Sequence, residues 1–214
     1  MRSRRFRAFE RLTAGLDFSP ERPLTILDVG GTESFWEQRG WADRDDVAIT
    51  LLNLEAEETT HPCLTAVAGD ATALTYGDAS FDVVHSNSVI EHLFTHENQQ
   101  KMAAEIRRVG RCYWVQTPNH WFPVEPHFRT IGWQYLPVAA RVKICMMRKG
   151  VGRFDVKNEA EARAAVEEIR LLSGREVRRL FPDARVLRER YLGLTKSFVA
   201  IRGFPGVDDA SLSA

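Results

Sequence analysis

The sequence contains few cysteines and no CxxC motif. Its three cysteines, Cys63, Cys112 and Cys145, lie far apart in a chain of 214 residues. An odd number of scattered cysteines argues against a disulfide framework and is typical of reduced thiols. We therefore expect a cytoplasmic protein whose core forms without covalent cross-links, which a chain of this length can do.

Long apolar runs and net charge are also missing. No run approaches the roughly 18 residues of a membrane-spanning helix. The N-terminus has arginines but neither the apolar segment nor the cleavage site of a secretory signal. The 29 Lys and Arg residues balance the 29 Asp and Glu residues. Because proteins dedicated to duplex nucleic acid are usually basic, we expect no specific nucleic-acid partner.

Charged residues are unevenly distributed along the chain. Residues 1–11 contain five arginines and one glutamate, and residues 126–154 contain six bases and no acid. We expect a basic helix within residues 1–23. The segment 126–154 is also rich in aromatic side chains. It is either a core-packing insertion with a solvated basic rim, or a lid or surface for an anionic or lipid-like partner, including a peripheral membrane contact.

Short apolar runs followed by turn residues recur along the chain. Such runs are typical of buried parallel strands, and they occupy residues 24–30, 47–54, 64–69, 81–85 and 111–117. Two further strands are predicted near residues 185–191 and 196–202. Only about four residues separate these two strands, which is too few for a parallel crossover, so we expect them to pair antiparallel.

Helical patterns lie between the strands. One apolar pattern runs from Thr95, a candidate N-cap, to Gly110, a candidate C-cap glycine. Residues 158–172 predict a second helix, and Ser173 with Glu176 is typical of a capping box that starts a third. The alternation predicts an α/β fold, with a mostly parallel sheet, helices on both faces and a C-terminal antiparallel hairpin.

Small and polar residues follow four of the predicted strands. They are Asp28, Gly30 and Gly31 after the first strand, Asn53 and Glu55 after the second, Asp70 and Ala71 after the third, and Ser86 and Asn87 after the fourth. In such a sheet, ligands bind at the carboxyl ends of the strands. Glycines permit close approach of the backbone, and an acid about 20 residues later suits a ribose diol. The spacing therefore predicts a nucleotide-type cofactor.

The motifs ILDVGG, GDAT and SFDVVHSNSVIEHL resemble those of class I S-adenosylmethionine-dependent methyltransferases, in the branch that acts on small molecules and lipids. The resemblance covers residues 24–117 and the terminal hairpin. It implies a Rossmann-like, seven-stranded sheet in which only the last strand is antiparallel. The sequence departs from the family at Thr32 and Ser34, which replace two glycines of a GxGxG pattern, and at Asn53, where the family has an acid.

The resemblance implies S-adenosylmethionine as the cofactor. By position it assigns Asp28, Gly30 and Gly31 to the methionine moiety, Asn53 or Glu55 to the ribose, Asp70 and Ala71 to the adenine, and Ser86 or Asn87 to the methionyl chain. No cofactor motif lies in the first eleven residues. We therefore expect that deletion of residues 2–11 leaves cofactor binding intact.

A sulfonium methyl group is already activated, so the protein mainly aligns the two reactants. A hydroxyl acceptor also needs a general base, usually histidine near neutral pH. The candidates are His92, after the fourth strand, and His120 and His127, after the fifth. The spacing of His120, Glu125 and His127 matches no zinc motif. Some quinone-pathway O-methyltransferases hold a divalent metal with an ExxEH motif, but Ser88 replaces its first glutamate here, so we expect no metal.

We expect one methyltransferase domain over residues 1–214, with an inserted substrate or lid segment at 118–156 and a flexible tail at 204–214. The enzyme would methylate a small-molecule, sugar or lipid-linked acceptor, with oxygen favoured. The missing glycines also suit a non-catalytic S-adenosylmethionine-binding module. A nucleotide-dependent oxidoreductase is less favoured, because the turn GGTES lacks the GxGxxG pattern. No DPPY or NPPY motif follows the fourth strand, which argues against methylation of nucleic-acid bases. The sequence predicts no oligomeric state.

Overall fold

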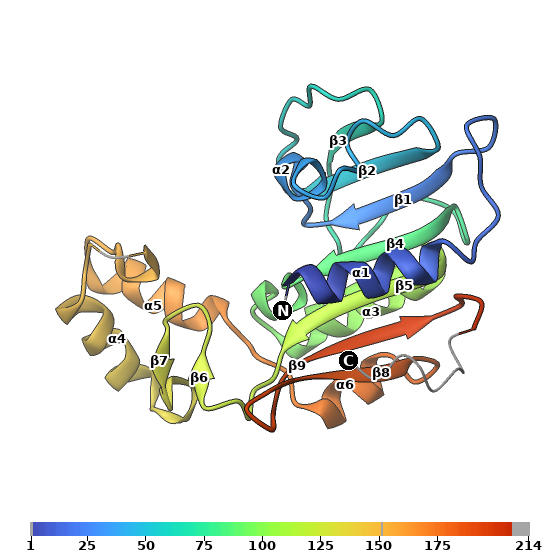
Figure 1. Cartoon of the computed structure of the whole chain (residues 1–214). Coiled ribbons are helices and arrows are strands. Elements are labelled where there is room, and N and C mark those ends of the chain that lie inside the picture. Colours follow the sequence, from blue (N-terminus) through green and yellow to red (C-terminus); the bar gives the residue numbers. More distant parts are fainter. Residues whose placement is uncertain (1, 151, 207–214) are drawn as a thin grey trace.

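The computed structural model describes residues 2–150 and 152–206 and is built on a seven-stranded sheet (Figure 1). The strands are β1 (Leu24–Val29), β2 (Val47–Asn53), β3 (Leu64–Ala68), β4 (Phe81–Asn87), β5 (Gly110–Pro118), β8 (Arg185–Tyr191) and β9 (Leu194–Arg202). Their order in the sheet is β3-β2-β1-β4-β5-β9-β8. Strands β1 to β5 are parallel, and β9 is antiparallel to both of its neighbours. The predicted Rossmann-like fold with its terminal hairpin is confirmed.

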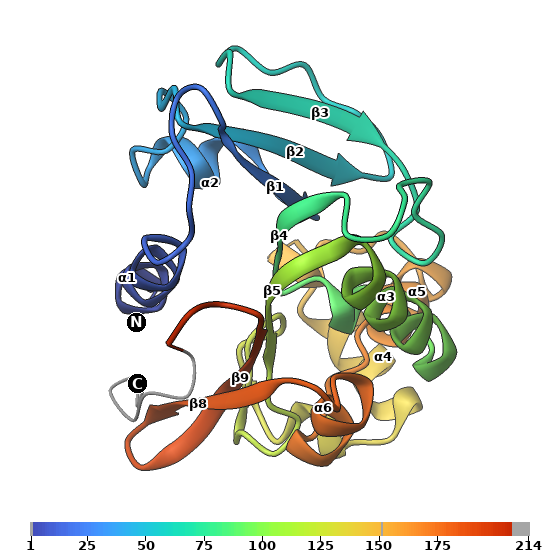
Figure 2. The same ribbon diagram turned by 90° about the vertical axis from the view of Figure 1, so that its right-hand side faces the viewer.

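Helices cover both faces of the sheet, as predicted (Figure 2). They are α1 (Arg2–Thr13), α2 (Glu33–Glu37), α3 (His96–Val109) and α6 (Gly174–Leu180). Helices α1 and α2 pack in one hydrophobic cluster, and α3 and α6 pack in another on the opposite face. The predicted caps at Thr95 and at Ser173 with Glu176 are present. No helix in the described residues combines the length and apolarity needed to cross a bilayer.

Gly110 is the C-cap of α3, as predicted, with an extended and not a left-handed backbone. Its φ is −98°, and it is already the first residue of β5. A Cβ atom at this position would lie 2.7 Å from the Cys112 carbonyl oxygen and 2.7 Å from Val84 Cγ2. The glycine is therefore needed because helix α3 turns directly into a strand that packs closely against β4.

The residues between β5 and α6 form a lobe beyond the carboxyl ends of the parallel strands (Figure 1). It contains β6 (Val124–Glu125), β7 (Thr130–Ile131), α4 (Val138–Met147), α5 (Glu159–Glu168) and the short helices η2 (Trp133–Tyr135) and η3 (Gly152–Phe154). Phe128, Trp133 and Phe154 pack with α4 and α5 in a third hydrophobic cluster. The lobe thus has a core of its own, and it includes α5, which follows the 118–156 segment expected from the sequence.

Helix α5 is shorter than the predicted helix over residues 158–172. Asn158 caps its start by accepting a hydrogen bond from the Glu161 amide at 2.9 Å. After Glu168 the chain leaves the helix, because the Arg170 amide donates to the Glu91 carbonyl oxygen at 2.7 Å. Leu172 then forms a parallel bridge with Asn119. These contacts tie the lobe to the end of the sheet.

Helix α1 lies where a basic N-terminal helix was expected, and its apolar face is part of the core. Phe6 and Phe9 are buried, and the Phe9 ring packs edge-on against Trp114 of β5 with their centroids 5.7 Å apart. Phe204, the first residue of the expected tail, is buried in the same cluster, and residues 207–214 lie outside the described part. Deletion of residues 2–11 would open this cluster, which argues against the expectation that it leaves cofactor binding intact.

Candidate functional site

The loop between β1 and α2 turns on two glycines at the carboxyl edge of the sheet. Gly30 has a φ of +73°, and a Cβ atom there would lie 2.4 Å from Val89 Cγ2. A Cβ atom on Gly31 would lie 2.1 Å from Asp28 Oδ2. Only glycine fits at these two positions. The sharp turn is therefore kept although the next family glycines are replaced.

Asp28 supports this loop from below. It is 2% exposed, and its two oxygens contact the His85 Nδ1 atom and the Trp36 Nε1 atom, each at 2.8 Å. The carboxylate therefore anchors β1 to α2 and β4 within the protein. His85 is buried between aromatic rings and was not among the histidines that the sequence indicated.

The ends of β2 and β3 carry the next predicted residues. The Asn53 side-chain amide donates to the Gly31 carbonyl oxygen at 2.8 Å, which fixes the end of β2 against the glycine loop. Glu55 is exposed two residues further on. Asp70 is also exposed and accepts hydrogen bonds from the Thr72 amide and hydroxyl, which hold the pKa of its carboxyl below the usual range. Its Oδ2 atom has no hydrogen-bond partner in residues 2–150 or 152–206.

The end of β4 lies beside the N-terminal half of α1. Ser86 is buried and donates to the Val29 carbonyl oxygen at 3.2 Å. Asn87 Oδ1 accepts a hydrogen bond from Arg5 at 2.5 Å, and Arg5 also forms a bidentate pair with Glu189 of β8. A cavity of about 270 Å³ between α1 and this edge is lined by aromatic rings together with Arg5, Asn87 and Ser88. The predicted cofactor residues of four strands thus lie along one edge of the sheet.

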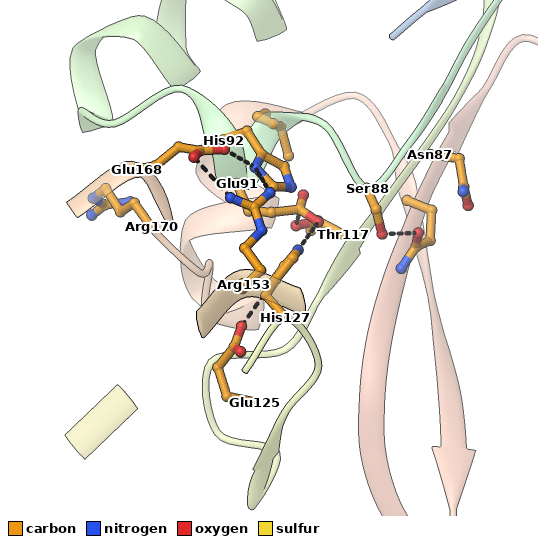
Figure 3. A network of polar contacts seen from close by, with 12 residues as sticks. Asn87, Ser88, Glu91, His92, Thr117, Glu125, His127, Arg153, Glu168 and Arg170 are labelled. Atoms are coloured by element: carbon orange, nitrogen blue, oxygen red, sulfur yellow. Dashed lines mark hydrogen bonds and ion pairs between the residues drawn. The ribbon is translucent and has the colours of Figure 1, made fainter. Parts of the chain in front are cut away.

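Two of the three predicted histidines meet in a polar cluster where the lobe joins the sheet (Figure 3). The rings of His92 and His127 are perpendicular, with their centroids 4.8 Å apart. The Nδ1 atom of His127 lies 2.6 Å from Glu125 Oε1, and the Nδ1 atom of His92 lies 2.6 Å from Glu168 Oε1. Each histidine is therefore oriented by a carboxylate, and neither Nε2 atom has a hydrogen-bond partner among the described residues.

Glu91 lies at the centre of this cluster and was missed as a functional residue. It is completely buried, and its Oε2 atom accepts a hydrogen bond from Thr117 at 3.1 Å. Burial raises the pKa of Glu91 to about 7. Its Oε1 atom has no hydrogen-bond partner in the described structure and lies 3.9 Å from His127 Nε2. A buried glutamate that titrates near neutral pH is typical of an acid–base site.

The environment of His92 differs from that of His127, because Arg153 lies next to the His92 ring. Its guanidinium pairs with Glu168 at 2.8 Å and lies 3.2 Å from His92 Nδ1. Burial lowers the pKa of His92, the hydrogen bond that its ring donates to Glu168 acts against this, and the nearby charge of Arg153 lowers the pKa further. Glu91, His92 and His127 also offer three ligand atoms within 4.8 Å of one another, a set that could hold a metal ion.

His120 does not join the polar cluster. It lies in a separate cavity in contact with the rings of Trp121 and Tyr135. Burial lowers its pKa, against the charge of Glu176. Among the three predicted bases, the structure therefore brings His92 and His127 together and leaves His120 apart.

The fold and one segment of the sequence match known proteins. Residues 42–112 match the family described as "Methyltransferase domain". This segment, about a third of the chain, is that of a class I S-adenosylmethionine-dependent methyltransferase domain. S-adenosylmethionine is the methyl donor that this family implies. No curated protein sequence matches the chain significantly.

Solved methyltransferase structures share the fold of this domain at low sequence identity. A SAM-dependent methyltransferase from Methanosarcina mazei is 14% identical, with a TM-score of 0.50 over 89% of this chain and 95% of its own. The methyltransferase solved with the Trm112 activator of Haloferax volcanii is 15% identical, with a TM-score of 0.54 over 94% and 90%. The methyltransferase domain of the bacterial CtHen1-CN is 12% identical, with a TM-score of 0.53 over 92% and 96%.

The residues at the carboxyl edge fit S-adenosylmethionine. The turn at Gly30 and Gly31 keeps side chains away from the edge, as a closely approaching ligand requires. The unpartnered Oδ2 atom of Asp70 is an acceptor of the kind that an adenine amino group needs. Asn53 retains its side-chain oxygen for a ribose hydroxyl, because its bond to Gly31 uses only the nitrogen.

Proposed function

We propose that this methyltransferase transfers the methyl group to an oxygen atom of a small-molecule acceptor, sugar-like or lipid-linked, at the polar cluster of Glu91, His92 and His127. The observation that carries the proposal is the pairing of His127 with Glu125. This carboxylate fixes the Nδ1 atom and leaves Nε2 facing the buried Glu91. A histidine oriented in this way is suited to accept a proton from a hydroxyl group.

The cofactor occupies the edge formed by β1 to β4 in this proposal. Asp70 and the Ala71 amide bind the adenine, Asn53 with Glu55 binds the ribose, and the glycine loop borders the methionine moiety. Ser86 and Asn87 lie near the methionyl chain. Asp28 acts from beneath the loop, because both of its oxygens are engaged within the protein. The bound cofactor supplies an activated methyl group.

The 3.9 Å gap between His127 Nε2 and Glu91 Oε1 is too long for a direct hydrogen bond and suits a bridging oxygen. An oxygen about 2.8 Å from both atoms would see them at an angle of about 90°, which is compatible with two hydrogen bonds. The acceptor hydroxyl therefore donates its proton to His127, and its oxygen accepts a hydrogen bond from the protonated form of Glu91. The protein's main contribution is this alignment, because the methyl group needs no further activation.

The first experiment separates the proposed function from a non-catalytic module. The purified protein is incubated with S-adenosylmethionine and a panel of phenols, sugar alcohols and amines, and release of S-adenosylhomocysteine is measured. Turnover of hydroxyl acceptors supports the proposal. Binding of S-adenosylhomocysteine without turnover of any acceptor supports the binding module, and thermal stabilisation by NAD alone supports an oxidoreductase.

The role of His127 is tested with a matched histidine variant. We expect His127→Asn to lower kcat at least about 100-fold for a hydroxyl acceptor, with rescue at high pH, where the acceptor ionises by itself. His120→Asn is the control and should change kcat less than about threefold, because His120 lies outside the cluster. Activity should survive removal of divalent ions by EDTA. If activity is lost on chelation and returns with added metal, the cluster binds a catalytic metal ion. This result would contradict the role of His127 as a free base.

A further inference from the structure

A basic cleft lies on the lobe next to the polar cluster. It has a volume of about 860 Å³. Four of its lining side chains are cations, namely Arg129, Arg148, Lys149 and Arg153, and no acidic residue lines it in the described part of the chain. Phe128 and Phe154 form its apolar wall, and both are buried in the core of the lobe. The cleft is thus a positively charged surface on a packed support.

Two of the four cations already have partners that hold them in place. Arg153 pairs with Glu168 at 2.8 Å. Arg148 donates to the Thr130 hydroxyl at 3.2 Å, and its guanidinium lies 5.1 Å from the centre of the Phe154 ring. These contacts position the cations, and Glu168 is the carboxylate that neutralises part of this charge.

The other two cations have no carboxylate partner. Arg129 and Lys149 form no ion pair with the residues that the structure describes, and both are exposed. Arg129 also has a φ of +47°, a left-handed conformation that a residue with a side chain rarely adopts. A strained arginine at the mouth of a cleft is typical of a position maintained for binding.

The cleft is continuous with the proposed acceptor position through one turn. The hairpin β6–β7 is closed by residues 126–129, of which His127 reaches the polar cluster and also lines the cleft. A ligand in the cleft therefore lies against the same imidazole ring that would receive the acceptor's proton. The two binding regions therefore share this one side chain.

We propose that this cleft binds a phosphoryl group carried by the methyl acceptor, as a phosphate monoester or a pyrophosphate. Several cations around an apolar wall, without an acid, match the charge and the many acceptor oxygens of such a group. The substrate class is then a phosphorylated compound whose free hydroxyl reaches His127. This inference rests on the proposed function for the position of the hydroxyl, but the cleft itself can be tested without turnover.

The test measures binding of inorganic pyrophosphate to the full chain by calorimetry, with no methyl donor present. Arg129→Gly removes one unpaired cation and suits the left-handed backbone, so the fold is retained. We expect this variant to weaken pyrophosphate binding at least about tenfold, the effect of one lost charge-assisted hydrogen bond. Arg163→Ala, on α5 of the same lobe, removes an equal charge that pairs with Glu159 and Glu167 and should leave binding unchanged.

Each outcome decides the proposal. Selective weakening by Arg129→Gly supports it, whereas no binding of pyrophosphate, or equal weakening by both variants, overturns it. Vesicles of phosphatidylcholine with and without phosphatidylglycerol form the second arm. Binding to the anionic vesicles without binding of pyrophosphate would make the lobe a membrane surface and overturn the proposal. Binding of S-adenosylhomocysteine, measured in parallel, reports on the cofactor site and separates failure of the cleft from failure of the proposed function.

Discussion

Replacement of Glu91 by glutamine should stabilise the protein at neutral pH. Glu91 is completely buried, and burial raises the pKa of its carboxyl from about 4.5 to about 7. The folded protein therefore binds this proton more tightly than the unfolded chain does. The stability that comes from protonated Glu91 is present in full below about pH 4.5 and is lost as the pH rises through 7.

The magnitude follows from this difference in pKa. A change of about 2.5 in pKa corresponds to about 3 kcal/mol in the free energy of unfolding. Glutamine keeps the shape of the side chain and carries no charge at any pH. We therefore expect Glu91→Gln to be more stable than the parent protein by up to about 3 kcal/mol above pH 7.5. This advantage should disappear between pH 7 and pH 4.5.

Urea unfolding at several pH values between 4.5 and 8.5 measures this effect. The quantity of interest is the difference in unfolding free energy between variant and parent, because titration of groups that do not interact with Glu91 cancels. Glu97→Gln is the control, since Glu97 is exposed on α3 and its pKa is lowered by Lys101. A difference for Glu91→Gln that does not change with pH would refute the argument that burial holds this proton.

Two further predictions concern the cofactor edge and α1. Asp70→Ala should weaken S-adenosylhomocysteine binding about 10- to 100-fold in calorimetry, with only a small change in Tm, because the lost hydrogen bonds to Thr72 are exposed. Asp17→Ala, at another exposed aspartate, is the control and should leave binding unchanged. An unchanged Kd for Asp70→Ala would contradict the assignment of Asp70 to the adenine. Deletion of residues 2–11 should abolish cooperative thermal unfolding, because the loss of Phe6 and Phe9 alone lowers the free energy of unfolding by several kcal/mol, on the order of a large-to-small core substitution. A folded deletion variant would show that the sheet is stable without α1.

The fold could be predicted because its signals are local. Buried parallel strands appear as apolar runs, and the capping box of Ser173 with Glu176 depends on two residues three positions apart. The short connection between β8 and β9 fixed their antiparallel pairing. Gly110 was predicted as the C-cap of α3, but its close packing against β4 carries no signal in the sequence. The end of α5 was missed because a distant contact, between Arg170 and Glu91, ends the helix.

The gathering of the proposed cofactor residues along one edge of the sheet could also be predicted, whereas the polar cluster could be predicted only in part. The carboxyl ends of parallel strands converge by topology, so residues that follow the strands meet without further information. The partners of the histidines come from distant segments. Glu168 lies 76 positions from His92 and carries no signal of its own in the sequence. The burial that raises the pKa of Glu91 likewise depends on how the lobe covers the end of β4.

The turn at residues 126–129 explains why composition left two interpretations of the basic segment open. Phe128 points into the core of the lobe and is 1% exposed. His127, one residue earlier, packs against His92, and Arg129, one residue later, is exposed at the basic cleft. Three consecutive residues thus serve packing, the polar cluster and the charged surface. A core-packing insertion and a charged surface are therefore not alternatives here, because neighbouring side chains of one turn point in different directions. A count of basic and aromatic residues does not show which of these side chains are buried and which are exposed.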